Sequence, residues 1–483
     1  MTNLPVGWKY APLKKLGSYV NGRAFKPNEW KTKGLPIIRI QNLNNNQAKF
    51  NYSDNKHEER YFVKNGDLLV AWSASLGVFI WDRGNAWLNQ HIFRVEVNES
   101  IVTKNFLYYG IKEAISDLYT KTHGTGMVHV TKPVFEGHAI PVPPINEQRR
   151  IVAKLEKLLQ KVDACKERLD KIPTILKRFR QSVLAAACSG RLTEDWRENN
   201  PYVETATELL MRIQSEKKKT KKQLIKPHNI LEEALFDIPD SWAFCFFEDI
   251  AANKPNSLKA GPFGSALTKS CYVTSGYKIY GQEQVIRGDH SYGDYYIDEE
   301  KFFALQTCEV KAGDILVSLV GTIGKVLIIP DIFEKGIINP RLIKITLFEE
   351  VSRKYIASFL SSTVAMNALR KDSHGGTMEI LNMRMLKNLP IPIPPINEQH
   401  EIVRRIEALF KVADRIEERY NKARTYTDKL TQSILAKAFR GKLVPQDPTD
   451  EPASELLKRI KEEKTKIETK AKTKRGRKSK VQA

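Results

Sequence analysis

Two clusters of polar side chains have the chemistry that is needed to read a nucleic-acid sequence. An arginine can form paired hydrogen bonds with guanine, and an asparagine or glutamine with adenine, when a rigid scaffold holds the side chain. Side chains of this kind follow the first expected strand of each half of the chain: Arg39, Gln41, Asn42 and Asn44 in the first half, and Gln282, Gln284 and Arg287 in the second. We expect each cluster to contact DNA, and the alternative for any single member is an exposed polar turn.

Loops and matched residues outside these clusters add candidates for contact with DNA. Two glycine-bearing loops, at 22–27 and 261–269, could bring backbone N–H groups and lysine side chains to phosphate oxygens. The segments HGTGM and HGGTM occupy equivalent places in the two halves, and their histidines either contact phosphates or bases or are ordinary loop residues. The additional candidates are Arg23, Lys26, His123, Lys269, Arg341 and His374.

The candidates come in pairs because the chain contains two versions of one unit. The box PPINEQ begins at Pro143 and again at Pro394, and QSVLAAACSGRL and QSILAKAFRGKL follow the two boxes at the same distance. The match weakens upstream but persists, as in LNQHIFRV and INPRLIKI. Internal repeats decide the architecture of a chain. We interpret this one as a common frame that carries two divergent modules, and the alternative is an old duplication without a two-site function.

The elements that must position these residues form two mixed α/β (α+β) modules. Stretches rich in β-branched and aromatic residues predict strands at 35–40, 67–72 and 91–97, and an apolar stripe predicts a helix at 104–121. We expect the following division of the chain: a first module at 1–143, a first spacer region at 144–238, a second module at 239–392, a second spacer region at 393–462, and a lysine-rich, disordered tail at 463–483.

A long helix with a narrow apolar seam is predicted after each PPINEQ box. Apolar residues recur at alternating steps of four and three, which is the pattern of a coiled coil. We therefore expect helices over about 146–187 and about 397–438 that pack on each other, with Asn146 as a helix cap and Cys165 as a small buried seam residue. The predicted seam consists of Ile151, Leu155, Leu158, Val162, Leu169 and Leu176 in the first helix, and of Ile402, Ile406, Leu409, Ile416, Leu430 and Ile434 in the second.

The charge of the chain favours a polyanionic partner. The formal net charge is +22, and the sequence pI is about 9.5. Such a balance is most often a sign of nucleic-acid binding, and the alternative is a charge that serves solubility, with part of the excess in the tail. Five cysteines without a CxxC pair, the lack of a signal peptide and the lack of a long apolar run predict a cytoplasmic protein.

The motifs of catalysis and metal binding are missing from the sequence. GTIGK at 321–325 lacks the first glycine of a P-loop, and we find no HExxH and no strand–GxGxxG–helix unit. We therefore predict no catalytic residues, no metal site and no cofactor site in this chain. The sequence favours a binding protein over an enzyme.

The residues above resemble those of the specificity subunits of type I restriction–modification systems. The resemblance covers nearly the whole chain and rests on the twin PPINEQ boxes, the segment 178–197 and the GPFGS and GLPIIRIQNL stretches. It implies two target-recognition domains separated by two long antiparallel helices, each domain reading one half of a bipartite target in double-stranded DNA. It also implies that two adenine methyltransferase subunits and further restriction subunits join the chain, and that these partners hold S-adenosylmethionine, ATP and magnesium.

The resemblance gives the PPINEQ boxes a possible second role. They either form docking surfaces for the methyltransferase subunits or only mark a domain boundary and start a helix. The residues of this predicted docking set are Pro143, Pro144, Glu147, Gln148, Pro394, Pro395, Glu398 and Gln399. Two competing functions are a self-contained DNA methyltransferase or nuclease and a coiled-coil DNA scaffold without sequence preference.

Overall fold

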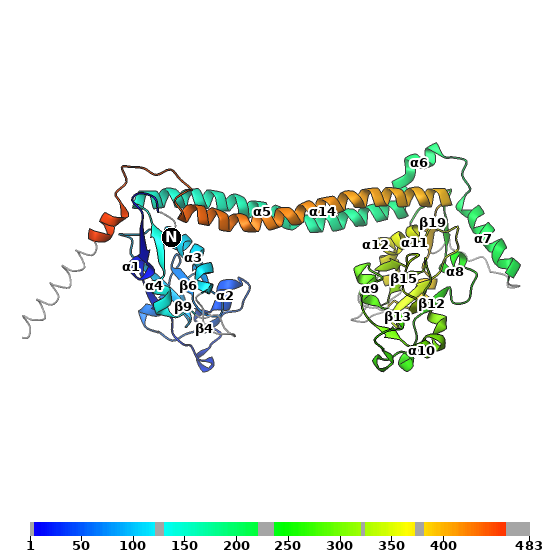
Figure 1. Ribbon diagram of the computed structural model, residues 1–483, viewed down its shortest axis with the longest axis horizontal. Helices are drawn as coiled ribbons and strands as arrows, with labels where there is room; N and C mark the ends of the chain where they lie inside the picture. The colour runs from blue at the N-terminus through cyan, green and yellow to red at the C-terminus, as the bar shows by residue number, and fades with distance from the viewer. Residues whose placement is uncertain (1–3, 121–129, 221–235, 320–323, 372–380, 460–483) are drawn as a thin grey trace, which may run out of the picture. The chain divides into compact units, whose positions relative to one another are not determined.

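The computed structural model describes residues 4–120, 130–220, 236–319, 324–371 and 381–459. The chain divides into two compact units (Figure 1). The first unit contains residues 1–170 together with 421–483, and the second contains residues 171–420. Each unit therefore combines one α/β domain with a part of both long helices. No helix within the described residues has both the length and the apolar character that crossing a membrane requires.

The domain of the first unit is built from two four-stranded sheets. One sheet is antiparallel and has the order β2-β9-β6-β7, with strands at Gly17–Asn21, Ile92–Val97, Leu68–Ala71 and Gly77–Ile80. The other has the order β4-β3-β8-β5, with strands at Asn51–Ser53, Leu35–Ile38, Ala86–Leu88 and Phe62–Val63, and β3 and β8 run parallel. The three strands and the long helix that the sequence predicts here are confirmed.

Short helices and a two-stranded ribbon complete this domain. The ribbon pairs β1 (Lys9–Pro12) with β10 (Ala139–Val142) in antiparallel fashion, and it joins the two ends of the domain. The helices are α1 (Leu13–Leu16), α2 (Ile40–Asn44), α3 (Lys104–Thr120) and α4 (Lys132–Gly137). The buried face of α3, with Phe106, Leu107 and Ile111, packs in the same core as the antiparallel sheet.

The domain of the second unit repeats this topology, except that its mixed sheet has three strands, without a counterpart of β5 among the described residues. Its sheets have the orders β12-β18-β15-β16 and β14-β13-β17, with β13 and β17 parallel. The strands lie at Ala243–Cys245 (β11), Leu258–Ala260 (β12), Tyr277–Tyr280 (β13), Tyr296–Ile297 (β14), Ile315–Ser318 (β15), Val326–Ile328 (β16), Gly336–Ile338 (β17), Leu342–Ile345 (β18) and Ile391–Ile393 (β19). The helices lie at Phe247–Ile250 (α8), Gln282–Arg287 (α9), Glu299–Ala304 (α10), Arg353–Leu360 (α11), Thr363–Lys371 (α12) and Met383–Lys387 (α13). The repeat seen in the sequence thus extends to the strand order of both sheets.

Two long helices, α5 (Ile145–Cys188) and α14 (Ile396–Phe439), follow the PPINEQ boxes. They pack in antiparallel fashion within each unit. Lys166 and Arg424 of the first unit pair with Asp428 and Asp170, and in the second unit Arg180 reaches both Asp414 and Glu417, at 2.7 Å each. The fold class predicted from the sequence is confirmed. Asn146 lies inside the first turn of α5, so its prediction as the helix cap is wrong by one residue or more.

The seam is buried mainly where a domain covers the helices. The predicted seam residues that are buried are Ile151, Leu155, Val162, Leu176, Ile402, Ile406 and Ile434, whereas Leu158, Leu169, Leu409 and Leu430 are half-buried. Ile416 is 42% exposed and Cys165 is exposed, so both are corrections to the prediction. The physical reason is that two helices alone cover only one side of a seam residue, while the ends of the pair are also covered by a domain core.

A short segment follows each long helix and packs on a domain. After α5, Gly190 takes a left-handed φ of +76°, and the chain continues through α6 (Glu194–Asn199) and α7 (Ala206–Thr220). Ala206 is buried and donates its N–H to Ser241. After α14, Gly441 takes a φ of +69°, and the buried Ala453 donates its N–H to Gly7 in the same way. The segment that precedes the lysine-rich tail is therefore a structural part of the first unit.

Candidate nucleic-acid interface

Buried hydrogen bonds of the second PPINEQ box connect α14 to the second domain, and we call this set of contacts a lock. The Glu398 side chain is fully buried, and its carboxylate accepts hydrogen bonds from Trp242 Nε1 at 2.8 Å and from Thr193 Oγ1 at 2.6 Å. Arg197 forms an ion pair with the same carboxylate at 2.6 Å. The neighbouring Gln399 accepts a bond from the Ser352 N–H and donates one to the Pro394 carbonyl, each at 2.8 Å.

The first box forms the same lock with fewer partners. Glu147 accepts a bond from Trp8 Nε1 at 3.0 Å, and its Oε1 is buried without a hydrogen-bond partner among the residues that the structure describes. Gln148 accepts a bond from the Thr103 N–H at 2.8 Å and donates to the carbonyls of Ile101 and Pro143. The two locks therefore share the tryptophan and the glutamine bonds, but among the described residues only the carboxylate of the second lock is paired with an arginine.

These contacts decide between the two interpretations of the boxes. All eight residues of the predicted docking set are buried. The polar atoms of the glutamates and glutamines are bonded within their own unit, apart from one Glu147 oxygen. Their prediction as a docking surface is wrong for this structure, because a partner could reach them only if the domain separated from its helix. The signal for the lock was present in the sequence as the matched tryptophans Trp8 and Trp242.

Burial of Glu147 predicts a pH dependence of stability in the first unit. Burial raises the pKa of this carboxyl above its usual range, against the opposing effects of the Trp8 bond and of the nearby Arg150. The folded state therefore binds this proton more tightly than the unfolded state, and the resulting stabilisation is lost as the pH rises through the folded-state pKa. Relative to the wild type, a Glu147→Gln variant is expected to gain thermal stability as the pH rises from 4 to 8. A difference in Tm that did not change with pH would contradict this expectation.

Two of the predicted DNA-reading residues come together in the second domain. Gln282, at the start of α9, donates from Nε2 to the hydroxyl of Ser318 at 2.8 Å, where β15 ends. Arg341, on the connection between β17 and β18, is exposed and contacts Oε1 of Gln282 at 3.5 Å. An arginine and an amide thus stand side by side at the edge of a rigid sheet. This arrangement suits the reading of base edges.

Two other predicted residues have structural tasks instead. Gln284 is buried, accepts a bond from the Gly281 N–H at 2.9 Å and donates to the Tyr292 carbonyl at 2.7 Å. Asn42 is buried at the equivalent place in the first domain, where it accepts a bond from the Arg39 N–H at 3.1 Å. Each side chain satisfies a backbone N–H group at the start of its short helix, α9 or α2. Neither is available to a base, and their prediction as DNA contacts is a correction.

The remaining candidates stay predictions, because most of them are exposed and their exposure alone does not test a contact with DNA. Gln41, Asn44, Lys26, Lys269 and Arg287 are exposed. Arg287 lies 4.0 Å from the ring centre of Tyr292, and Arg39 lies 5.0 Å from that of Trp30. Arg23 forms an ion pair with Glu29 at 2.5 Å, so its charge is partly used within the domain. His123 and His374 lie outside the described residues.

The first domain has a residue structurally equivalent to Arg341, His91, that sequence reasoning missed. The backbone N–H of Leu319 donates to the Arg341 carbonyl. At the equivalent place in the first domain, the backbone N–H of Trp72 donates to the His91 carbonyl. The rings of Trp72 and His91 lie 4.9 Å apart, and His91 has a left-handed φ of +70°. Backbone strain of this kind at a residue other than glycine often marks a functional position. The alignment of LNQHIFRV with INPRLIKI was the signal that could have found His91.

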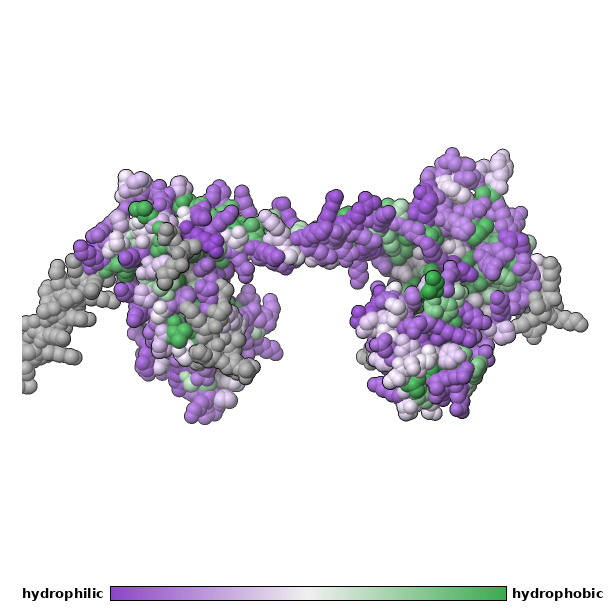
Figure 2. Space-filling model, in the orientation of Figure 1, coloured by the Kyte–Doolittle hydropathy of each residue, from purple (hydrophilic) through white to green (hydrophobic). Residues whose placement is uncertain are grey.

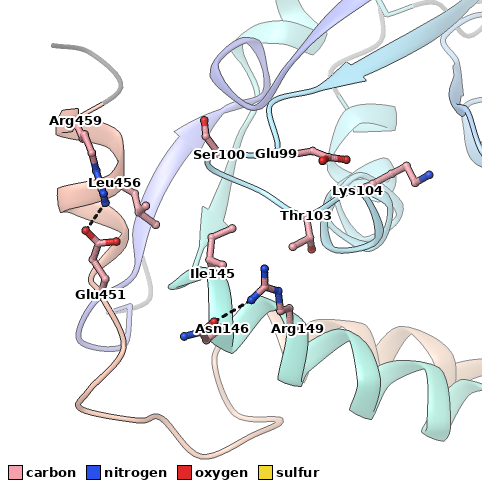
Figure 3. Close-up of a pocket in the computed structure, with 10 residues that line it drawn as sticks. All are labelled: Glu99, Ser100, Thr103, Lys104, Ile145, Asn146, Arg149, Glu451, Leu456 and Arg459. Carbon is pink, nitrogen blue, oxygen red and sulfur yellow. Dashed lines mark hydrogen bonds and ion pairs between the residues drawn. The ribbon is translucent and has the colours of Figure 1, made fainter. Parts of the chain in front are cut away.

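A polar cavity of about 550 Å³ lies beside the start of α5 in the first unit (Figure 3). Its lining includes Asn146, an exposed member of the PPINEQ box, and Arg149, the exposed residue that follows the box, and Arg149 donates to Asn146 at 3.1 Å. The opposite side is formed by the segment after α14, where Arg459 pairs with Glu451. The cavity thus depends on the packing of the chain's C-terminal region against the first domain.

The duplicated scaffold, with polar side chains at equivalent loop positions, defines a class of two-domain recognition proteins. The family described as type I restriction modification DNA specificity domain matches residues 5–174 and 265–423. The EcoBI specificity subunit of Escherichia coli is 32% identical over 468 residues, which is 95% of this chain and 92% of that protein. The EcoKI specificity subunit of Escherichia coli K12 is 28% identical over 501 residues, which is 95% of this chain and 96% of that protein.

Two solved structures share the fold. A chain of a type I restriction–modification system matches with a TM-score of 0.65 at 17% identity, over 92% of this chain and all of that one. The HsdS subunit of Thermoanaerobacter tengcongensis matches with a TM-score of 0.54 at 17% identity, over 91% of this chain and 98% of that one. This chain belongs to the family of type I restriction–modification specificity subunits.

Proposed function

We propose that the chain is the non-catalytic subunit that reads a bipartite target in double-stranded DNA, one half-site with each domain. The observation that carries the proposal is one scaffold with different side chains at equivalent positions. The second domain has Arg341 where the first has His91, and Gln282 where the first has the half-buried Ile40, which packs against a core cluster. Side chains with different donors and acceptors on the same frame suit different base sequences. The names of the relatives, which are specificity subunits, support the same reading.

The duplicated frame also supports the recruitment of two methyltransferase subunits. Each unit repeats the same lock, domain topology and trailing segment. A surface that occurs twice can bind two copies of one partner in equivalent ways. In the proposed complex, adenine methylation with S-adenosylmethionine and cleavage with ATP and magnesium belong to the methyltransferase and restriction subunits. Because the eight residues of the predicted docking set are buried, the proposed docking surface consists of other, exposed residues of the two units.

An Arg341→Ala variant tests the proposal. The variant is expected to relax the sequence requirement at one or two positions of one half-site, because a paired arginine–guanine contact contributes about 1–3 kcal/mol of discrimination. Methylation mapping of the host genome would show the change at single-base resolution. An Arg384→Ala variant is a matched control, because it removes an equal charge from an exposed site on α13. Equal changes in both half-sites, or none in either, would contradict the proposal.

A further inference from the structure

Phe263 is an exposed aromatic residue without a structural task. It is 82% exposed, and no ring contact or cation–π contact involves it in the part of the chain that the structure describes. Other exposed aromatic residues of this domain are packed on neighbours, as Phe303 is on Phe302 at 5.7 Å and Tyr295 is on Tyr272 at 5.7 Å. The surface seen in Figure 2 is mostly hydrophilic. An isolated phenylalanine in water contributes nothing to the core, so its place suggests a task in binding.

The loop that carries Phe263 is held on both sides. Gly261 donates its N–H to the Leu342 carbonyl at 2.9 Å, and a Cβ atom on Gly261 would lie 1.9 Å from the Asn339 carbonyl oxygen. Pro262 is buried and has a fixed φ, and Leu267 is buried in the core of the second domain. Between them, the 3-10 turn at Gly264–Ala266 follows directly after Phe263. The phenylalanine is therefore presented by an anchored turn.

The anchor of this loop is also the segment that carries Arg341. Gly261 contacts the connection between β17 and β18 at Asn339 and Leu342, on either side of Arg341. Arg341 is fixed there by a bond from its N–H to the Asn339 side chain at 2.9 Å. The exposed aromatic ring and Arg341 thus belong to adjoining, mutually anchored loops, and Gln282 at the start of α9 contacts Arg341.

We propose that Phe263 is a wedge that inserts between base pairs of the half-site read by the second domain. This inference rests on the proposed function. Apolar side chains that enter a base step partly unstack it and bend the duplex, and an anchored loop can hold the ring in place during insertion. Arg341 on the adjoining loop, in contact with Gln282, supplies hydrogen bonds that fix the position of the insertion.

The first domain lacks this device. Gly22 corresponds to Gly261, because it donates its N–H to the Ile92 carbonyl at 3.0 Å and its Cβ would lie 2.0 Å from the Asn89 carbonyl oxygen. Two residues further on stands Ala24, where the second domain has Phe263. An alanine is too small to separate two bases. The wedge therefore acts on one half-site only, and the other half-site serves as an internal control.

The test uses the full chain and duplexes that carry the target found by methylation mapping. One duplex has 2-aminopurine in the half-site of the second domain, at a position that is not methylated, and another has it in the half-site of the first domain. Binding of the wild type is expected to raise 2-aminopurine fluorescence only in the duplex that carries 2-aminopurine in the half-site of the second domain. Phe263→Ala is expected to abolish this rise and to weaken binding about tenfold, while Phe263→Leu keeps part of both effects. Ile332→Ala, which removes an equally exposed apolar side chain of the same domain, is expected to change neither.

Each outcome decides a separate question. A wild-type chain that binds the mapped target no better than random DNA would overturn the proposed function itself. A wild type that binds specifically, with a Phe263→Ala variant of unchanged affinity and fluorescence, would overturn only the wedge. Loss of methyltransferase association in Phe263→Ala, at unchanged fluorescence and DNA affinity, would instead make the ring a protein contact and would also overturn the wedge. Because Phe263 is exposed, an unchanged Tm of the variant is expected.

Discussion

Seven residues added to each of the two long helices are expected to widen the gap between the two proposed DNA half-sites by about three base pairs. The seam of α5 and α14 repeats every seven residues, so an added heptad restores the phase of the apolar positions. It lengthens each helix by about 10 Å at about 1.5 Å per residue. A DNA duplex rises by about 3.4 Å per base pair, which converts this length into the expected change.

The ion pairs between the helices show where to make the insertions. Placed after Asp170 in α5 and before Arg424 in α14, the added residues leave the Asp170–Arg424 pair intact in the first unit. The pairs of Arg180 with Asp414 and Glu417 stay intact in the second unit. Methylation mapping then reports both half-sites and the gap. A heptad in α5 alone is the control, because it breaks the register of the pair and is expected to abolish methylation. An unchanged gap in the variant with both insertions would contradict the prediction that the helices set the distance between the half-sites.

Removal of the Glu398 carboxylate is expected to destabilise the second unit by about 3 kcal/mol. Glu398→Ala leaves the indole N–H of Trp242 buried without an acceptor and leaves Arg197 without its partner. The loss of one member of a buried ion pair typically costs about 3–5 kcal/mol, and we take the lower end because Arg197 keeps partial access to water. Glu147→Ala is expected to cost the first unit only about 1 kcal/mol, since it leaves one indole N–H unpaired and also removes a buried, incompletely bonded carboxylate.

Hydrogen exchange of the full chain measures these two effects separately for each unit. Protection in α11 reports on the second unit, and protection in α3 reports on the first. Glu407→Ala is a suitable control on the same helix as Glu398, because Glu407 is exposed and pairs with the exposed Lys354. Equal losses of protection from Glu398→Ala and Glu147→Ala would show that the arginine contact does not distinguish the two locks.

Much of the fold followed from patterns along the chain. Alternating steps of four and three predicted the long helices to within about a residue at each end, and β-branched runs predicted the strands at 35–40, 67–72 and 91–97. The repeat predicted one topology used twice. These features depend on local periodicity and on self-similarity, which the sequence carries directly.

The sequence predicted the candidate site less well than the fold, because burial in the folded structure decides which of the predicted polar residues can contact DNA. Asn42 and Arg39 are close neighbours in the sequence, and so are Gln282 and Gln284, yet one of each pair is buried beneath a helix turn. The residue type is the same for an amide side chain that bonds to backbone N–H groups and for one that contacts a base. Only the direction of each side chain on its short helix separates them. His91 was missed because its importance arises from its contact with Trp72 across two strands.

The sequence by itself determined the duplicated architecture, the coiled-coil pair and the family resemblance, because these depend on residue types at fixed spacings. The tertiary structure decided the role of the PPINEQ boxes. Their glutamates accept bonds from tryptophans that are more than 100 residues away in the sequence, and this contact turns an apparent docking motif into the lock between a domain and its helix. It also decided that Cys165 and Ile416 are exposed, because neither side chain belongs to the core cluster that covers the helices in its unit.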